Sequence, residues 1–262
     1  MGEQVSVEAR NSKLSDRFVY GTDAKVPSVD QRIWRYMTLP SLLYVLAERR
    51  IHFSRIWELD DMSEGTISRA QVNDLALDLE DAGRIELLPT LVQMYTNFVT
   101  GCAISCWHAS ETESVAMWHL YTTGYDGVAI STTVGKLMNS LSSKGIDDFR
   151  FNVGHVKYID HKADVITETP PERQTSLQCL FHKSLEYAHE QEVRIVVVMP
   201  QGKPYPRSEL DFQLESLSFI EQITVSPRFP TWALPALQSA ISTFGIKVSL
   251  GTSALRDSLR PR

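Results

Sequence analysis

The segment Y-A-H-E-Q-E-V-R-I-V-V-V, residues 187–198, decides how the rest of the chain is interpreted. Its second half is an unbroken apolar run, which is typical of a strand buried on both faces. Glu190 and Glu192 stand one residue apart where that strand begins, and a rigid strand end can aim charged side chains without burying them in the core. Two carboxylates there favour chemistry on a polar substrate, although glutamate is also an ordinary residue at strand ends.

The segments on either side of this strand alternate between the hydrophobic patterns of strands and helices. Period-two patterns predict strands at 33–37, 51–55, 102–107, 128–132, 151–159, 192–199, 220–225 and 246–250. Helical spacing predicts helices at 38–50, 114–121, 134–141, about 175–189 and 232–244, with 70–100 mostly helical. This irregular interleaving predicts an α+β fold with mixed, largely antiparallel sheets, flanking helices and a helical insertion around 70–100.

The composition is that of an ordinary globular protein. The chain has 262 residues, of which 43% are hydrophobic and 22% charged, so it can bury a sizeable core. Residues 1–30 are polar and without sustained periodicity, so we expect a flexible extension followed by a single α+β domain over 31–262. The net charge of −6 does not favour a nucleic-acid partner, although a local basic groove would not be excluded by it.

The compartment is inferred from the cysteines and from the hydropathy pattern. Three cysteines, Cys102, Cys106 and Cys179, form an odd and sparse set that suits a reducing compartment. The N-terminus has no apolar core of signal-peptide length, and no run of about 18 apolar residues exists, so we expect no membrane partner. These observations predict a cytoplasmic protein.

Six short motifs occur in a fixed order along the chain. They are W-R-Y-M at 34–37, H-F-S-R at 52–55, C-W-H at 106–108, E-S-x-x-M-W-x-x-Y at 113–121, G-V-A-I-S-T-T at 127–133 and E-x-E-V-R at 190–194. Together they resemble a bacterial family, the domain of unknown function numbered two-nine-seven-one, over roughly residues 33 to 255. Some members of that family sit near phage-defence genes, which implies a role in defence. The motifs also supply candidate ligand-binding residues, namely Tyr36, Ser54, Arg55 and Arg194.

A more distant similarity concerns chemistry. The chain resembles ADP-ribosyltransferases of the arginine–serine–glutamate type, which carry an Arg on an early strand, a Ser-Thr-Ser on a middle strand and an E-x-E before a later one. Here Arg35, then Ser131-Thr132-Thr133, then Glu190 and Glu192 follow that order. The third residue of the middle motif departs from the pattern, and the gap between the first two motifs is long. The resemblance implies NAD as the substrate.

Each of these residue types suits a step in cleaving the nicotinamide–ribose bond of NAD. A planar guanidinium such as that of Arg35 binds pyrophosphate oxygens bidentately, and Ser131 and Thr132 would fix the ribose. The resemblance assigns to Glu192 the stabilisation of an oxocarbenium-like state and to Glu190 the acceptor. Alternation places both carboxylates on one side of an extended backbone.

Plainer interpretations stay open for the same residues. Arg35 between two aromatic residues can simply stack on them. Ser131-Thr132-Thr133 can be a strand end followed by the N-cap of the next helix. The two glutamates can pair with Arg194 or Lys183.

A second group of residues is rich in aromatic rings. Its members are Trp107, His108, Glu113, Trp118 and Tyr121. The rings suit a pocket for a flat ligand with His108 and Glu113 as its polar groups, or else a core where a helix packs. The sequence thus predicts an NAD-cleaving enzyme whose macromolecular target is unknown, with a non-catalytic ligand-sensing module of a defence system as the alternative.

Metal chemistry is not favoured. Cys102, Cys106 and His108 are residue types that zinc accepts, but their spacing matches no strong zinc motif. Carboxylates for a magnesium-dependent nuclease exist at 60–64 or at 190–192 with Lys183, without a recognisable string. We therefore expect no metal site.

Overall fold

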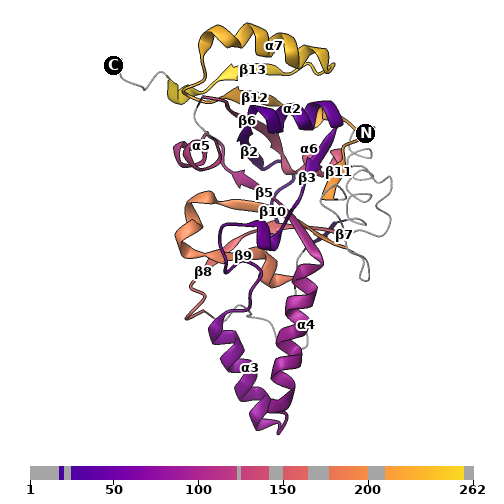
Figure 1. Ribbon diagram of the computed structural model, residues 1–262, viewed down its shortest axis with the longest axis vertical. Helices are drawn as coiled ribbons and strands as arrows, with labels where there is room; N and C mark the ends of the chain where they lie inside the picture. Colours follow the sequence, from indigo (N-terminus) through magenta and orange to yellow (C-terminus); the bar gives the residue numbers. More distant parts are fainter. Residues whose placement is uncertain are drawn as a thin grey trace, which may run out of the picture. The chain divides into compact units, whose positions relative to one another are not determined.

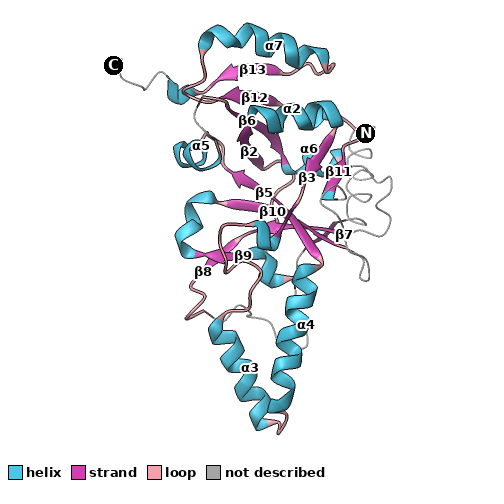
Figure 2. Ribbon diagram, viewed as in Figure 1, coloured by secondary structure: helices cyan, strands magenta, loops and turns pink. Residues whose placement is uncertain are grey.

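A computed structural model of the chain describes residues 18–20, 25–122, 125–141, 150–164, 177–199 and 210–256. Its strands pair in a mixed pattern in which antiparallel pairs predominate, and helices flank them (Figure 2). The predicted α+β class is confirmed.

Two compact units make up the chain. The first takes in Met1–Pro27, Phe53–Ser105 and Asp148–Tyr205, and the second takes in Ser28–His52, Cys106–Asp147 and Pro206–Arg262. Strand β5 (Cys102–Ala109) contributes its first half to the first unit and its second half to the second. The single domain expected over 31–262 stays a prediction.

The strands of the first unit centre on β10 (Glu192–Val198). β10 runs antiparallel to β7 (Arg150–His155) and lies next to β5, while β1 (Phe18–Tyr20) pairs with β7 in parallel. β4 (Ser54–Arg55) pairs with β5, and β8 (Lys157–Ile159) with β9 (His182–Ser184). The side chains of β10 from Glu192 to Val197 are buried, as the unbroken apolar run predicts.

The helical insertion belongs to the first unit. It consists of α3 (Arg69–Asp81), a short 3₁₀ turn η2 (Ile85–Leu87) and α4 (Leu88–Thr100), which lie beside each other as a hairpin (Figure 1). The Ser68 hydroxyl accepts the backbone N–H of Gln71 at 3.1 Å and starts α3, and Pro89 stands in the first turn of α4. The predicted insertion around 70–100 is confirmed.

The strands of the second unit centre on β2 (Arg32–Thr38) and β6 (Gly127–Thr133), which pair antiparallel over their whole length. β6 pairs with β12 (Gln222–Val225), and β12 pairs in parallel with β13 (Ser249–Thr252). The second half of β5 pairs with β2 on the other side. A separate ribbon joins β3 (Arg50–His52) to β11 (Asp211–Gln213).

Hydroxyl caps start three helices of the second unit. The described α-helices of this unit are α2 (Leu39–Glu48), α5 (Val115–Tyr121), α6 (Val134–Ser140) and α7 (Leu234–Thr243), of which α7 has no such cap. Thr38, Ser114 and Thr133 each accept a backbone N–H three residues ahead, so α2, α5 and α6 begin where strands or loops end. Shorter 3₁₀ turns complete the chain at η1 (Ile56–Glu58), η4 (Gln178–Phe181), η5 (Leu185–Glu190), η7 (Leu217–Phe219), η8 (Thr231–Ala233) and η9 (Ala254–Arg256).

The predicted helix at about 175–189 is wrong. Within the described part of that stretch the chain forms η4, then β9, then η5. Hydrogen bonds to distant parts of the chain override the local helix propensity here. β9 pairs with β8, and the Ser184 N–H donates to Asp61 Oδ2 at 3.1 Å. The strand expected at 151–159 is likewise two strands, β7 and β8, since the Val156 N–H leaves the ladder to bond the Glu192 carbonyl.

Candidate active site

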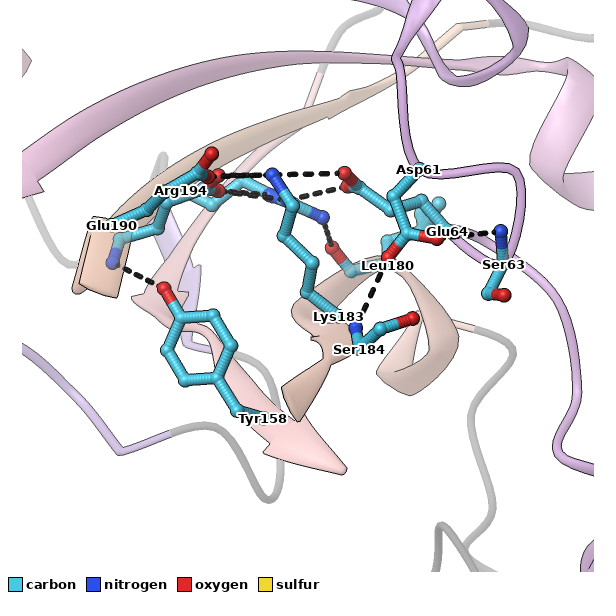
Figure 3. A network of polar contacts seen from close by, with 10 residues as sticks. Asp61, Ser63, Glu64, Tyr158, Leu180, Lys183, Ser184, Glu190 and Arg194 are labelled. Atoms are coloured by element: carbon cyan, nitrogen blue, oxygen red, sulfur yellow. Dashed lines mark hydrogen bonds and ion pairs between the residues drawn. The ribbon is translucent and has the colours of Figure 1, made fainter. Parts of the chain in front are cut away.

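A buried cluster of charged side chains lies in the first unit. It contains three carboxylates and two cations, none of them more than 5% exposed: Glu64, Lys183, Glu190, Glu192 and Arg194. They come from the loop before α3, from β9, from the end of η5 and from β10. Figure 3 labels four of them, Glu64, Lys183, Glu190 and Arg194, in one network of polar contacts. We call these five residues the charge cluster.

Lys183 lies at the centre of the charge cluster. Its Nζ lies 2.6 Å from Glu190 Oε2, 3.0 Å from Glu192 Oε1 and 3.2 Å from Glu64 Oε1. Two hydrogen bonds, to Glu190 and Glu192, and an ion pair with Glu64 surround the ammonium, so the lysine is held in one geometry.

Arg194 clamps two of the same carboxylates from the other side. Its Nη2 lies 2.6 Å from Glu64 Oε2 and 2.7 Å from Glu192 Oε2, and its Nη1 donates to the Leu180 carbonyl at 2.7 Å. Glu192 is therefore gripped by two cations, and its own backbone N–H donates to the Tyr158 hydroxyl at 2.9 Å.

The backbone at Gln191 explains why both glutamates of the E-x-E reach Lys183. Glu190 ends η5, Gln191 takes a left-handed conformation with φ of 44°, and Glu192 begins β10. The two glutamates converge, as the sequence predicts, but across a sharp turn and not along one extended strand. A non-glycine residue at positive φ is uncommon and is held there by its surroundings.

The cluster has one negative charge more than it has positive charges, and this imbalance separates the behaviour of the two glutamates. Burial, together with the hydrogen bond to Glu192, raises the pKa of Glu190 to about 7 although Lys183 pulls it down. For Glu192 burial opposes ionisation, but the charges of Arg194 and Lys183 and the hydrogen bonds outweigh it and lower its pKa. Glu192 is thus ionised at neutral pH, while Glu190 exchanges its proton there.

This asymmetry predicts a pH effect on stability. Glu190 binds its proton more tightly in the folded state, so the stability it contributes is complete below the ordinary glutamate pKa and is lost as pH rises through about 7. Replacing Glu190 with glutamine should remove a decline of about 2 kcal/mol in the free energy of unfolding between about pH 5 and pH 8. Urea unfolding at several pH values measures it.

Comparing the wild-type protein with Glu190→Gln isolates the contribution that the titration of Glu190 makes to stability. His182, whose pKa is lowered to about 4 by burial, contributes with the opposite sign below its ordinary pKa, but it is present in both. The exposed Glu186 offers a matched control, and Glu186→Gln should keep the wild-type slope. An unchanged slope in Glu190→Gln would remove the titration of Glu190 from the account.

Two members of the charge cluster are not among the NAD-site residues that the sequence predicts. The sequence suggests Lys183 only as a pairing or nuclease residue, and Glu64 only as a nuclease carboxylate. Glu64 stands 130 residues from Arg194, so no local pattern joins them. Across the described ranges no group of three or more His, Cys, Asp or Glu side chains is arranged to hold a metal ion. The carboxylates of the charge cluster form ion pairs with Lys183 and Arg194.

The strand register of the second unit separates Arg35 from Ser131. Ser131 is the cross-strand partner of Trp34, and Arg35 is the partner of Ile130. Cross-strand partners share a face and neighbours along a strand alternate, so Arg35 and Ser131 point to opposite faces. The expectation that both line one cleft is therefore not met, and the hydroxyl on the Arg35 face is that of Thr132.

Arg35 contacts an aromatic ring, but the ring belongs to Trp107 of β5, which is not one of the sequence neighbours on which stacking was expected. Its guanidinium lies 5.7 Å from the centroid of the Trp107 ring, and its Nη2 donates to the His52 carbonyl at 3.2 Å. Trp107 itself is 1% exposed. Arg35 thus stacks on a buried ring and bonds to the backbone, which is a structural role.

The Trp34 face carries a different arginine beside Ser131. Arg32 is the cross-strand partner of Thr133, which shares this face with Ser131. The Arg32 side chain is 35% exposed, and its Nε lies 3.8 Å from Glu111. The Ser131 Oγ is fully buried and has no hydrogen-bond partner within the described ranges. This face therefore offers a guanidinium and an unsatisfied hydroxyl on adjacent strands.

Trp118 of the second group packs in a core. Trp34, Tyr36, Met117, Trp118 and Ala129 form one buried cluster, in which the Trp118 ring meets the Tyr36 ring edge-on at 4.8 Å. The Trp118 indole N–H donates to Glu113 Oε2 at 2.9 Å, and Glu113 Oε1 accepts the Ala254 N–H. This packing favours the core interpretation over an open pocket.

The remaining candidates lie in several places. In the second unit His108 is buried with its ring near Tyr36, Tyr121 is 42% exposed at the end of α5, and Thr132 is fully buried with its hydroxyl donating to the Thr133 carbonyl. In the first unit Ser54 and Arg55 form β4, and the Arg55 guanidinium lies over the Trp57 ring at 5.3 Å. None of the described helices is long and apolar enough to cross a membrane.

Comparison with known proteins finds a similarity over part of the chain. The model of a family described as "Protein of unknown function (DUF2971)" matches residues 117–195, which confirms the resemblance over that stretch. No curated protein matches the chain.

Solved structures of one protein are similar to the chain at very low identity. DarT from Thermus sp. 2.9 in complex with NAD+ has a TM-score of 0.36 and 9% identity, covering 89% of this chain and 98% of that one. The same protein in complex with ADP-ribosylated ssDNA has a TM-score of 0.39 and 7% identity, with coverage of 89% and 98%. In complex with carba-NAD+ the values are 0.37 and 8%, with coverage of 88% and 98%.

Proposed function

We propose that this protein cleaves NAD and transfers its ADP-ribose group, with Glu192 as the carboxylate that stabilises the transition state. The observation that carries the proposal is geometric: Lys183 and Arg194 hold both oxygens of Glu192, and Glu190 lies beside it on Lys183. In this setting burial raises the pKa of Glu190 to about 7, whereas the two cations lower the pKa of Glu192. A pair of titratable groups whose pKa values are pushed apart is the usual arrangement for dividing charge stabilisation from proton transfer.

Glu192 suits charge stabilisation because its charge is fixed in place. Loss of nicotinamide leaves positive charge on the ribose, and a preorganised carboxylate lowers the energy of that state without reorganising. Lys183 and Arg194 hold both oxygens of Glu192, so its orientation does not depend on the substrate. These two cations act as positioning residues.

Glu190 suits the acceptor side of the reaction. A group that titrates near pH 7 removes a proton from an incoming hydroxyl, amine or amide nitrogen more effectively than an ordinary carboxylate does. The acceptor can be a protein, a nucleic acid or a free nucleotide. A place in phage defence stays a prediction that rests on the family resemblance.

Of the two arginines of β2, Arg32 suits a phosphate-bearing ligand better than Arg35 does. Arg32 shares the Trp34 face with the unsatisfied Ser131 hydroxyl, whereas Arg35 is committed to Trp107 and to the His52 carbonyl. Since Arg32 also lies before Ser131 and Glu192 in the chain, the order of the three motifs is preserved.

The test is nicotinamide release from NAD, followed by chromatography. Glu192→Gln should lower kcat by about 100- to 1000-fold, the usual effect of removing one preorganised electrostatic group. Glu190→Gln should slow transfer to an added acceptor more than it slows NAD hydrolysis. The exposed Glu186→Gln serves as the matched control. Nicotinamide release that is unaffected by Glu192→Gln would exclude Glu192 from the mechanism.

The two arginines form a second matched pair in the same assay. Arg32→Gln should raise KM for NAD by about tenfold with a smaller effect on kcat, because a charge-assisted bond to bound substrate is lost. Arg35→Gln should leave KM near the wild-type value when compared at equal folded fraction. The reverse result would restore Arg35 as the pyrophosphate ligand.

A further inference from the structure

The charge cluster is almost closed to solvent. Lys183 is 5% exposed, and Glu190 and Glu192 are each 3% exposed. A substrate touches only groups that solvent can reach, so NAD cannot contact Glu192 while the cluster stays covered. If Glu192 acts on NAD as proposed above, part of the cover must therefore move.

The 3₁₀ turn η5 forms a surface segment of that cover. Four of its six residues are exposed, namely Leu185, Glu186, Ala188 and His189. The other two contact Lys183, whose Nζ lies 4.6 Å from the centroid of the Tyr187 ring and 2.6 Å from Glu190 Oε2. One side of η5 thus faces water, and the other side lies on the charge cluster.

Both ends of η5 are fixed to the rest of the first unit (Figure 3). Before it, the Ser184 N–H donates to Asp61 Oδ2 at 3.1 Å, and after it, the Glu192 N–H donates to the Tyr158 hydroxyl at 2.9 Å. Gln191 lies between η5 and the second of these anchors, with a φ of 44°. A non-glycine residue at positive φ is strained, so a rotation at Gln191 that lifts η5 relieves strain.

The hydrogen bonds inside η5 are weak. A 3₁₀ turn has poorer hydrogen-bond geometry than an α-helix, and here the Gln191 N–H reaches the Ala188 carbonyl at 3.4 Å. β10, which begins at Glu192, is instead paired with β7 over six residues and is buried from Glu192 to Val197. Lifting η5 therefore costs less free energy than opening β10.

We propose that η5 is a lid over the charge cluster, which swings outward between Ser184 and Gln191 and exposes Lys183 and Glu192. Tyr187 is its latch, because opening breaks the contact between its ring and the Lys183 ammonium. Glu190 is the last residue of η5 and moves with the lid. That the opening admits NAD rests on the proposed function, whereas the opening itself does not.

Chemical labelling of the full chain measures the opening. A water-soluble carbodiimide with glycine ethyl ester labels Glu192 when the lid is open. A maleimide labels Cys102, a thiol of β5 that is 0% exposed, when the first unit unfolds. With each rate divided by its rate in the urea-unfolded chain, Glu192 should be accessible at least about tenfold more often than Cys102. Equal accessibility would mean that only unfolding exposes Glu192, and would refute the lid.

Two substitutions of Tyr187 test the latch. Tyr187→Phe keeps an aromatic ring over Lys183, so Glu192 should be labelled within about twofold of the wild-type rate. Tyr187→Ala removes the ring and should raise the labelling of Glu192 about tenfold, with that of Cys102 unchanged. If the labelling of Glu192 does not rise, or if that of Cys102 rises equally, Tyr187 is not a latch and the proposal fails.

Nicotinamide release separates failure of the lid from failure of the proposed function. The labelling needs no NAD, so frequent opening together with wild-type release by Glu192→Gln would refute the function and leave the lid standing. Glu192 that is labelled no more often than Cys102, together with a large loss of release in Glu192→Gln, would refute the lid alone.

Discussion

Lys183→Met is expected to destabilise the first unit by about 3–5 kcal/mol, one of the largest effects of any single substitution in this chain. Methionine keeps much of the side-chain volume, so the loss is electrostatic. It leaves Glu64, Glu190 and Glu192 buried with Arg194 as their one remaining cation. Urea unfolding, with hydrogen exchange of the β10 amides to report on this unit, measures the change.

A second substitution separates electrostatics from packing. Adding Glu190→Gln to Lys183→Met should recover part of the lost stability, because the double variant has one buried negative charge fewer. Lys162, an exposed lysine of the same unit, is the control, and Lys162→Met should change stability by less than about 0.5 kcal/mol. If the double variant is no more stable than Lys183→Met, the destabilisation has another cause, such as strain around the new side chain.

The sequence predicts the part of the charge cluster that the E-x-E contributes, but not the distant residues that complete it. The E-x-E before an apolar run is a local pattern, and it places Glu192 correctly at the start of a buried strand, whereas Glu190 ends η5. Glu64 joins them from the loop before α3, and such a contact depends on how distant segments fold together. Lys183 was expected on a helix, and its place on β9 is set by pairing with β8.

The same distinction explains the arginines. A motif of the form W-R-Y marks a strand correctly, and β2 is that strand. Which of Arg32 and Arg35 shares a face with Ser131 depends on the register between β2 and β6, and a shift of one residue exchanges the faces. Register is set by pairing over the whole strand, so residue order alone did not reveal it.

Trp118→Ala is expected to destabilise the second unit by about 3–5 kcal/mol, the usual cost of deleting a large aromatic side chain from a core. Trp118 is 4% exposed and donates its indole N–H to Glu113, and the centroid of its ring lies 4.8 Å from that of the Tyr36 ring. Its removal would leave a cavity under α5 and an unsatisfied carboxylate oxygen. Hydrogen exchange of the β6 amides reports the loss in this unit.

The neighbouring Tyr121 decides between a core and a ligand pocket. Tyr121 is 42% exposed on the same short helix, so Tyr121→Ala should cost less than about 1 kcal/mol. If the aromatic group were instead an open pocket for a flat ligand, Trp118→Ala would leave the stability of the ligand-free protein nearly unchanged and would weaken ligand binding. If the aromatic group is a rigid core, Trp118→Ala should destabilise the ligand-free protein far more than Tyr121→Ala does, because the packing of Trp118 already stabilises the ligand-free fold.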